Sequence, residues 1–139
     1  MASGLRKREL NSKINYLIDK FKLDEVKDVP VNRISGGEKR KVTIAAALLG
    51  NPRVLLCDEP FSHLDVLTIQ MLQEIICDLQ KEHPSMAIVV ADHQPRELLA
   101  ISDRAFILSN RTIVAEGSPN SLLRNPEAKK HYFGHDWQY

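Results

Sequence analysis

An unbroken apolar run, Val-Leu-Leu-Cys at 54–57, leads directly into two adjacent carboxylates, Asp58 and Glu59. A short run of this kind is typical of a strand buried on both faces of a parallel sheet. The two acids would then lie at the carboxyl end of the strand, where open α/β sheets bind their ligands. Adjacent carboxylates are costly to bury alone, and Mg²⁺ held through water would offset that cost. The plain alternative is a strand that ends in two exposed acids before a proline turn.

A second element, Ile-Ser-Gly-Gly-Glu at 34–38, begins a predicted helix that ends near Gly50. Ser35 and Glu38 have the spacing of a capping box, which accounts for both residues as helix architecture. Two glycines in the first turn each cost up to about 1 kcal/mol relative to Ala, which suggests that something approaches this backbone closely. A helix N-terminus attracts anions, so phosphate is the natural candidate. By itself the motif fits a cap and a phosphate site equally well.

A third apolar run, at 87–91, ends in Asp92 and His93. As the end of another strand, His93 would reach the same sheet edge as Glu59, where an imidazole can hold an attacking water or a phosphate charge. A lone histidine is more often a structural residue. Asp65 lies where it would cap the helix that follows the two carboxylates.

The order and spacing of these elements resemble the ATP-binding domain of ABC (ATP-binding cassette) proteins. Residues 34–38 resemble the signature motif, with Ile for the usual Leu and Glu for the commoner Gln. Residues 54–59 resemble the Walker B strand, 62–65 the D-loop, and His93 the switch histidine. The resemblance implies an α/β fold: the carboxyl-terminal part of a P-loop NTPase (RecA-like) domain with part of its helical subdomain. Residues 1–50 would form the helical part and residues 51–139 the core part of one partial domain.

The resemblance also implies residue roles and partners. Asp58 would coordinate Mg²⁺ through water, Glu59 would act as general base on the attacking water, and His93 would contact the γ-phosphate of ATP. A second ATPase subunit would form a head-to-tail homodimer, and transmembrane permease subunits would bind the pair. The residues expected to bind the nucleotide across the dimer interface are Ser35, Gly36, Gly37, Glu38 and Asp65.

The sequence departs from the family pattern mainly by an absence. No Gly-x-x-x-x-Gly-Lys-Ser/Thr phosphate loop (Walker A) occurs in the 139 residues, and neither a Q-loop nor an upstream adenine-stacking aromatic is recognisable. Without the amides and the lysine of that loop, nothing would hold the β-phosphate. We therefore expect the isolated chain to be catalytically inactive. Smaller departures are His63, where a small residue is usual, and Ala46, where Arg is frequent.

A narrower likeness concerns residues 115–119 and 130–137, which together with 58–61 resemble the ATPases of lipopolysaccharide-export transporters. The ATPases of branched-chain amino-acid importers are the main rival within the superfamily. Split ABC heads of chromosome-maintenance proteins also separate Walker A from the signature, but they need long coiled-coil heptads before the signature, and residues 1–33 show only one short amphipathic helix. A non-catalytic protein that donates a signature motif in trans would have the same motifs.

Composition agrees with one globular unit. The chain is 43% hydrophobic with a net charge of +1, which gives no argument for a nucleic-acid partner. No run approaches the roughly 18 apolar residues of a membrane span. We expect a cytoplasmic protein that is peripheral to the inner membrane through its permease partners, without direct insertion. Cys57 and Cys77 are expected to be reduced thiols, and the histidines lack zinc-ligand spacing.

Periodicity and turn residues predict the remaining elements. Without the strand that leads into the phosphate loop, the strand at 54–57 should have an exposed apolar edge, which favours self-association. The expected helices are 7–22, 36–50, 66–82, 95–100, 121–124 and 127–132, and the expected strands are 54–57, 87–91, 104–108 and 112–116, with a turn at Asn110-Arg111.

Overall fold

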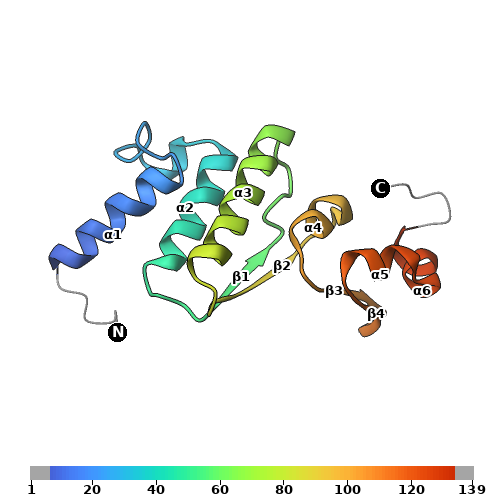
Figure 1. Cartoon of the computed structure of the whole chain (residues 1–139). Helices are drawn as coiled ribbons and strands as arrows, with labels where there is room; N and C mark the ends of the chain where they lie inside the picture. Colours follow the sequence, from blue (N-terminus) through green and yellow to red (C-terminus); the bar gives the residue numbers. More distant parts are fainter. Residues whose placement is uncertain (1–6, 134–139) are drawn as a thin grey trace. The chain divides into compact units, whose positions relative to one another are not determined.

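The computed structural model describes residues 7–133 (Figure 1). Between Ala91 and Asp92 the chain divides into two compact units, and each is described by itself. The assignment of 1–50 to a helical subdomain and 51–139 to a core stays a prediction. Of the tail that resembles lipopolysaccharide-export ATPases, residues 134–137 lie outside the described part.

From residue 7 onward, the first unit contains three α-helices, a short 3-10 turn and a two-stranded sheet. The predicted elements are confirmed, except that the first two helices each end two residues earlier than expected, at Lys20 and Leu48. The first helix cannot continue through Lys22, which has a positive φ of 51°. The elements are α1 (Lys7–Lys20), a 3-10 turn η1 (Val31–Arg33), α2 (Gly36–Leu48), β1 (Val54–Asp58), α3 (Val66–Glu82) and β2 (Ala87–Ala91).

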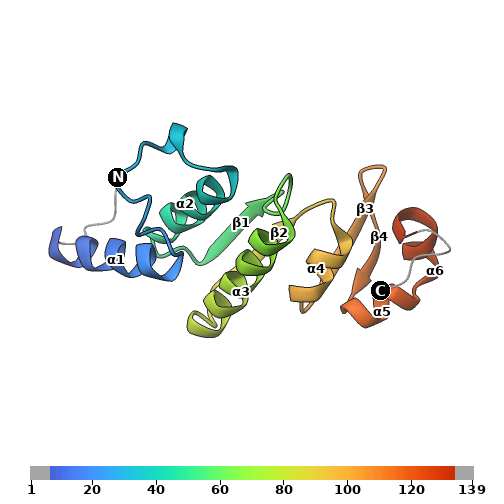
Figure 2. The same ribbon diagram turned by 90° about the horizontal axis from the view of Figure 1, so that it is seen from above.

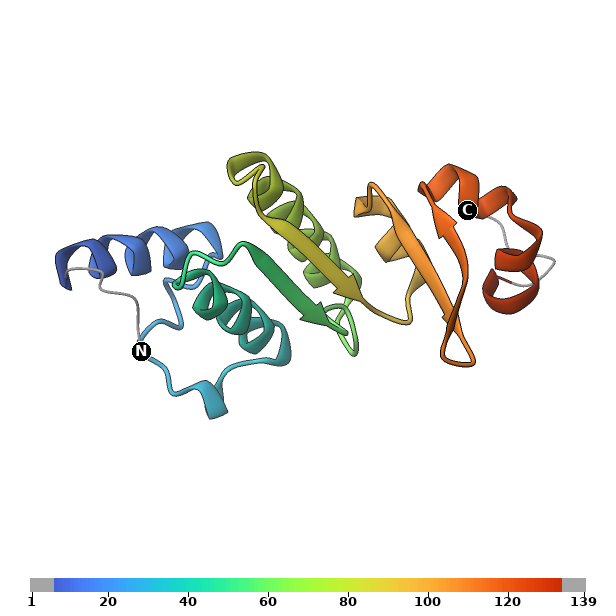
Figure 3. The ribbon, with the colours of Figure 1, turned by 90° about the horizontal axis from the view of Figure 1, so that it is seen from below.

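Strands β1 and β2 pair in parallel, with Leu56 opposite Val89 and Asp58 opposite Ala91. Helix α2 contacts β1 and helix α3 contacts β2. Both helices lie on the same side of the strands, and Figure 3 looks at the strands from the other side.

The expectation that β1 is buried on both faces is wrong for this chain. Leu55 and Cys57 are buried, whereas Val54 is 53% exposed and Leu56 is 73% exposed. Strand side chains alternate between the two faces of a sheet, so the helices cover only one face of β1. Full burial of one such Val or Leu side chain would contribute about 1.5–3 kcal/mol to the free energy of folding, a contribution that this face does not make. The sheet therefore exposes an apolar face as well as its edges.

Helix α3 supplies much of the core of the first unit. Its buried residues recur at helical spacing, which puts them on one stripe of the helix. Asp65 begins the helix as its N-cap, and the helix ends at Glu82, before His83. The buried stripe consists of Ile69, Leu72, Ile75, Ile76 and Leu79.

The carboxyl end of α3 holds α1 through one carboxylate, Glu82. Its two oxygens accept from the Tyr16 hydroxyl at 2.5 Å and from Lys20 Nζ at 2.7 Å. The hydrogen bond from Lys20, followed by the one from Tyr16, lowers the pKa of Glu82 from its ordinary value of 4.5. Glu82 thus joins α3 to Lys20 and Tyr16 of α1, which lie 62 and 66 positions earlier in the sequence, through two hydrogen bonds to its charged carboxylate.

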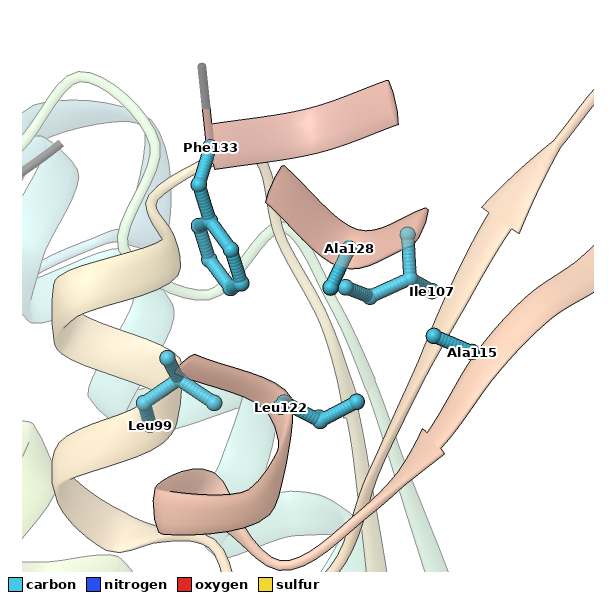
Figure 4. Close-up of a cluster of buried hydrophobic side chains, with 6 residues drawn as sticks. All are labelled: Leu99, Ile107, Ala115, Leu122, Ala128 and Phe133. Carbon is cyan, nitrogen blue, oxygen red and sulfur yellow. The ribbon is translucent and has the colours of Figure 1, made fainter. Parts of the chain in front are cut away.

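The second unit, as far as residue 133, packs short helices onto a β-hairpin. Its elements are α4 (Pro95–Ile101), β3 (Ala105–Ser109), β4 (Thr112–Gly117), α5 (Pro119–Arg124), α6 (Pro126–Ala128) and a π-helical turn η2 (Lys129–Phe133). The hairpin is antiparallel, and its turn residues Asn110 and Arg111 both have positive φ, as a type I′ turn requires. Figure 4 shows the core between these elements, formed by Leu99, Ile107, Ala115, Leu122, Ala128 and Phe133.

Three residues of the carboxyl-terminal likeness have structural roles. Gly117 has a φ of 152°, and a Cβ there would collide with Ser121 Oγ. Ser118 then caps α5 by accepting from the amide of Ser121 at 3.4 Å. Phe133 is buried in the core of Figure 4. These three residues therefore contribute to the folding of the second unit.

Replacing Glu82 by Gln is expected to destabilise the chain by up to about 1 kcal/mol near neutral pH. Because the folded state lowers the pKa of Glu82, its contribution is complete above about pH 4.5 and is lost as the pH falls through the folded value. The difference in unfolding free energy between wild type and Glu82→Gln should therefore shrink on acidification. Urea unfolding at several pH values measures it. Glu74→Gln, an exposed acid of the same helix, is the control, and a pH-independent difference would contradict the assignment.

Candidate functional site

The N-terminus of α2 carries the predicted capping box. Ser35 Oγ accepts from the amide of Glu38 at 3.2 Å, and Glu38 Oε2 accepts from the amide of Ser35 at 2.7 Å. The second of these bonds, which uses the Ser35 backbone, is the main cause of the lowered pKa of the Glu38 carboxyl. Ser35 and Glu38 are therefore explained as helix architecture, and their predicted contacts with nucleotide stay a prediction.

The two glycines that follow Ser35 have different surroundings. A Cβ added to Gly37 would lie 2.8 Å from Thr68 Cγ2, at the start of α3. A Cβ added to Gly36 would have nothing within 4 Å. The close approach inferred from sequence is thus supplied at Gly37 by the chain itself. Only Gly36 leaves open space beside the helix N-terminus.

The two carboxylates of the β1 junction lie at the carboxyl end of the parallel sheet, as predicted. Asp58 is the last residue of β1 and is exposed, and Glu59, the next residue, is half-buried. The amide of Glu59 donates to Ala91 O at 2.7 Å, which extends the ladder to the end of β2. Glu59 has a φ of 47°, a conformation that is uncommon for a residue other than glycine. Such local strain is frequent where a side chain has to be aimed.

The segment between β1 and α3 returns toward α2. Pro60 and Phe61 are fully buried and anchor it, whereas His63 is exposed with a φ of 59°. Ser62 Oγ and His63 Nδ1 are hydrogen-bonded at 2.7 Å. The segment ends at Asp65, whose predicted role as helix cap is confirmed.

Thr68 joins this segment to the signature helix. Its amide and hydroxyl donate to the two carboxylate oxygens of Asp65 at 3.0 and 2.6 Å, and the hydroxyl bond is the main reason that the pKa of Asp65 is lowered. Its methyl group is the one that lies against Gly37. The capping rule predicts the contact with Asp65, but only the tertiary structure reveals the contact with Gly37.

An open pocket of about 330 Å³ lies between the N-terminal turns of α2 and the segment that follows β1. Basic residues and hydroxyls dominate its wall, and none of the residues that line it is acidic. Helix α2 and the segment before α3 can be followed in Figure 2. The lining residues are Gly36, Lys39, Arg40, Thr43, Ser62, His63 and Leu64.

The three consecutive cations of α2 have different surroundings. Lys39 and Arg40 line the pocket. Lys41 is buried on another side of the helix, and its Nζ donates to Lys22 O at 3.4 Å. Burial lowers the pKa of Lys41. The three cations therefore do not share one face of the helix: Lys39 and Arg40 border the pocket, and Lys41 is buried.

A cage of protein ligands for a metal is not present: among residues 7–133, no three His, Cys, Asp or Glu side chains cluster for that purpose. Mg²⁺ in nucleotide sites keeps several waters and takes its other ligands from phosphates and one or two carboxylates. Asp58, exposed at the end of β1, fits that kind of ligand. The free thiol of Cys57 is buried behind it in β1, and burial raises its pKa.

His93 belongs to the second unit and is exposed two residues after the end of β2. Next to it, Asp92 Oδ1 accepts from the amide of Gln94 at 3.1 Å, just before α4.

Of the residues singled out in the sequence, the structure brings Gly36 together with Lys39, Arg40 and the segment at 62–64. The approach of His93 to Glu59 stays a prediction.

The contact between Gly37 and Thr68 can be tested with alanine substitutions. Gly37→Ala should destabilise the chain by about 1–3 kcal/mol, because Thr68 cannot turn its methyl away without losing a bond to Asp65. Gly36→Ala, which meets open space, should be neutral or stabilising by up to about 1 kcal/mol. Thermal or urea unfolding of both variants measures the difference.

Thr68→Ser supplies the rescue. It keeps the hydroxyl that bonds to Asp65 and removes the methyl that lies against Gly37. In a Thr68→Ser background, Gly37→Ala should lose most of its cost. Equal costs in the two backgrounds would show that Thr68 is not what excludes a side chain at Gly37.

Comparison with known proteins identifies the family. Residues 2–62 match the ABC transporter family. The chain is 33% identical to LptB, the lipopolysaccharide export system ATP-binding protein of Escherichia coli K12, over 134 aligned residues. This alignment covers 96% of the present chain and 55% of LptB. The chain is also 33% identical over 133 residues to a probable ABC transporter ATP-binding protein of Azorhizobium caulinodans, covering 96% of this chain and 46% of that protein.

Solved structures agree on the fold. The structure of cbiO1 from Clostridium perfringens, part of the ABC transporter complex cbiONQ, matches with a TM-score of 0.78 at 25% identity, over 91% of this chain and 50% of that chain. No helix within residues 7–133 is both long and apolar enough to cross a membrane. The chain spans about half the length of the curated relatives it matches. Its motifs, relatives and fold together place it in the ABC transporter ATP-binding family, as the carboxyl-terminal part of the nucleotide-binding domain.

Proposed function

We propose that the chain is the signature-bearing part of an ATP-hydrolysing ABC transporter subunit, one that energises lipopolysaccharide export. The observation that carries this proposal is the pocket between α2 and the segment after β1. Its wall combines the bare Gly36 backbone with Lys39 and Arg40, at a helix N-terminus. Such a wall favours a multivalent anion, and the family binds ATP.

The signature residues would hold the γ-phosphate of an ATP molecule bound by a second subunit. Gly36 offers an open approach to the backbone, and the capping box of Ser35 and Glu38 orients the first turn. Gly37 keeps α2 close to α3 through Thr68. Asp65, which is locked by Thr68, would lie at the interface with that second subunit.

The end of β1 would carry the hydrolytic chemistry. Glu59 would orient the attacking water and accept its proton, and the positive φ of its backbone sets its direction. His93 would donate to the γ-phosphate. Asp58 would hold Mg²⁺ through water, and the bound metal would neutralise charge on the phosphates.

Partners and location follow from the same proposal. The chain would act in a dimer of ATPase subunits bound to transmembrane permeases, at the cytoplasmic side of the inner membrane. Lipopolysaccharide as the transported substrate is supported by the 33% identity to LptB and by the tail likeness. Donation of a signature motif in trans is the second candidate, because the capped α2 is intact while the 139 residues contain no phosphate loop.

The isolated chain is expected neither to bind nor to hydrolyse ATP. Titration with Mg-ATP in a calorimeter should show no binding heat up to about 1 mM, since no phosphate loop holds the β-phosphate. Glu59→Gln serves as the parallel sample and should behave in the same way. Tight binding by either protein would overturn the proposal that the nucleotide site is incomplete.

Fusing the chain to the amino-terminal half of E. coli LptB tests the site residues. The fusion should hydrolyse Mg-ATP, and Glu59→Gln should lower the rate by about 10²-fold or more while leaving ATP binding intact. Growth of an E. coli strain depleted of LptB tests the substrate. Hydrolysis without rescue of growth would favour another transporter, such as a branched-chain amino-acid importer. Unchanged hydrolysis in Glu59→Gln would remove Glu59 from its proposed role.

A further inference from the structure

Of the positions where this chain departs from the family pattern, His63 is the one that lines the pocket between α2 and the segment after β1. A small residue is usual there, whereas this chain places an imidazole in the same wall as Lys39 and Arg40. The φ of His63, 59°, lies in the left-handed region, which favours glycine. Residues held in this conformation are frequent at functional sites, so the side chain of His63 calls for an account of its own.

The ring of His63 has one nitrogen engaged and one available. Ser62 Oγ and His63 Nδ1 are hydrogen-bonded at 2.7 Å, which restrains the ring. Ser62 is itself held by a turn, because its amide donates to Glu59 O at 3.2 Å. Among residues 7–133, no hydrogen bond or ion pair involves His63 Nε2. Since His63 is exposed, Nε2 is accessible to a ligand.

The charged groups that share the pocket with His63 are cations. Lys39 and Arg40 are the charged residues of the wall, which contains no acid. The nearest acid along the sequence, Asp65, lies outside the wall, and its two carboxylate oxygens accept from Thr68. A protonated His63 would be the third cation around a volume of about 330 Å³. Three cations around such a volume fit a ligand with several negative charges, such as a chain of phosphates.

We propose that His63 is a ligand-binding residue of this pocket, which donates from Nε2 to the phosphates of the nucleotide and makes their binding depend on pH. The proposal rests on the proposed function, which assigns the pocket to the phosphates of ATP. In the charged imidazole both nitrogens donate, so Ser62 Oγ accepts from Nδ1 while Nε2 donates to a phosphate oxygen. Protonation and binding are reciprocal: the charged ring binds phosphate more tightly, and bound phosphate favours the charged ring.

Titration of the full chain with sodium tripolyphosphate, followed by NMR at low ionic strength, tests the proposal. This probe contains three linked phosphates without the nucleoside, and NMR detects binding that is too weak to give heat at about 1 mM ligand. The amide signals of residues 36–40 and 62–64 should shift. The measured quantity is the ratio of the affinity at about pH 6 to the affinity at about pH 8, a range in which histidine gains its charge.

Three variants separate the charge of His63 from its place in the segment. His63→Asn removes the charge and suits a positive φ, so the affinity ratio of the wild type should exceed that of this variant by about threefold or more. The comparison also removes the change in the charge of the probe with pH. His63→Lys keeps a permanent cation, and Lys22 shows that the chain accommodates lysine at a φ of 51°. It should bind more tightly than His63→Asn at both pH values, with the same ratio.

His83→Asn is the matched control. His83 is exposed just after α3 and lies outside the wall of the pocket, so its replacement should leave the wild-type ratio unchanged. A ratio lowered equally by His63→Asn and His83→Asn would overturn the assignment to His63. Weaker binding that His63→Lys does not restore would show that the ring only supports the segment, and would overturn it as well.

Failure of this proposal is distinguishable from failure of the proposed function. Equal ratios in the wild type and His63→Asn, with shifts still centred on residues 36–40, would remove His63 from the site and leave the phosphate site itself intact. Absence of shifts at 36–40 in every protein would overturn both. Binding that depends on His63, together with a fusion to LptB that does not hydrolyse Mg-ATP, would uphold the role of His63 and contradict the proposed function.

Discussion

One-sided cover of the β1–β2 sheet is the constraint on which the first unit depends. Helices α2 and α3 bury Leu55 and Cys57 on one face, and the parallel pairing directs the carboxyl ends of both strands to the same edge. Asp58 and Glu59 lie at that edge as a consequence. The same pairing leaves Leu56 and Val89 exposed on the other face. The polar edge and the apolar face thus have a common origin.

A second constraint is the junction of α2 with α3. Thr68 contacts Gly37 with its methyl group and Asp65 with its hydroxyl, so the signature helix and the segment after β1 are held by one side chain. The pocket between them depends on this spacing. Loss of the whole threonine side chain would affect both α2 and the segment after β1. Serine removes only the methyl group that contacts Gly37 and keeps the hydroxyl that bonds to Asp65.

Much of the local structure could be predicted from sequence. The capping box of Ser35 and Glu38, the cap at Asp65 and the turn at Asn110-Arg111 are short-range features that a few residues specify. The order of helices and strands followed from periodicity. The one clear error concerned β1: an apolar run indicates that a strand can be buried on both faces, but whether a cover is present depends on residues elsewhere.

The sequence alone determined the family and the positions of its motifs, because the motifs are local and their order along the chain is specific. Only the tertiary structure separated the two glycines, since the neighbour of Gly37 is Thr68, 31 positions later in the numbering. It also distinguished Lys41, which is buried against the Lys22 carbonyl, from Lys39 and Arg40 at the pocket. Such differences arise from packing between distant segments, and residue type and local spacing carry no record of them.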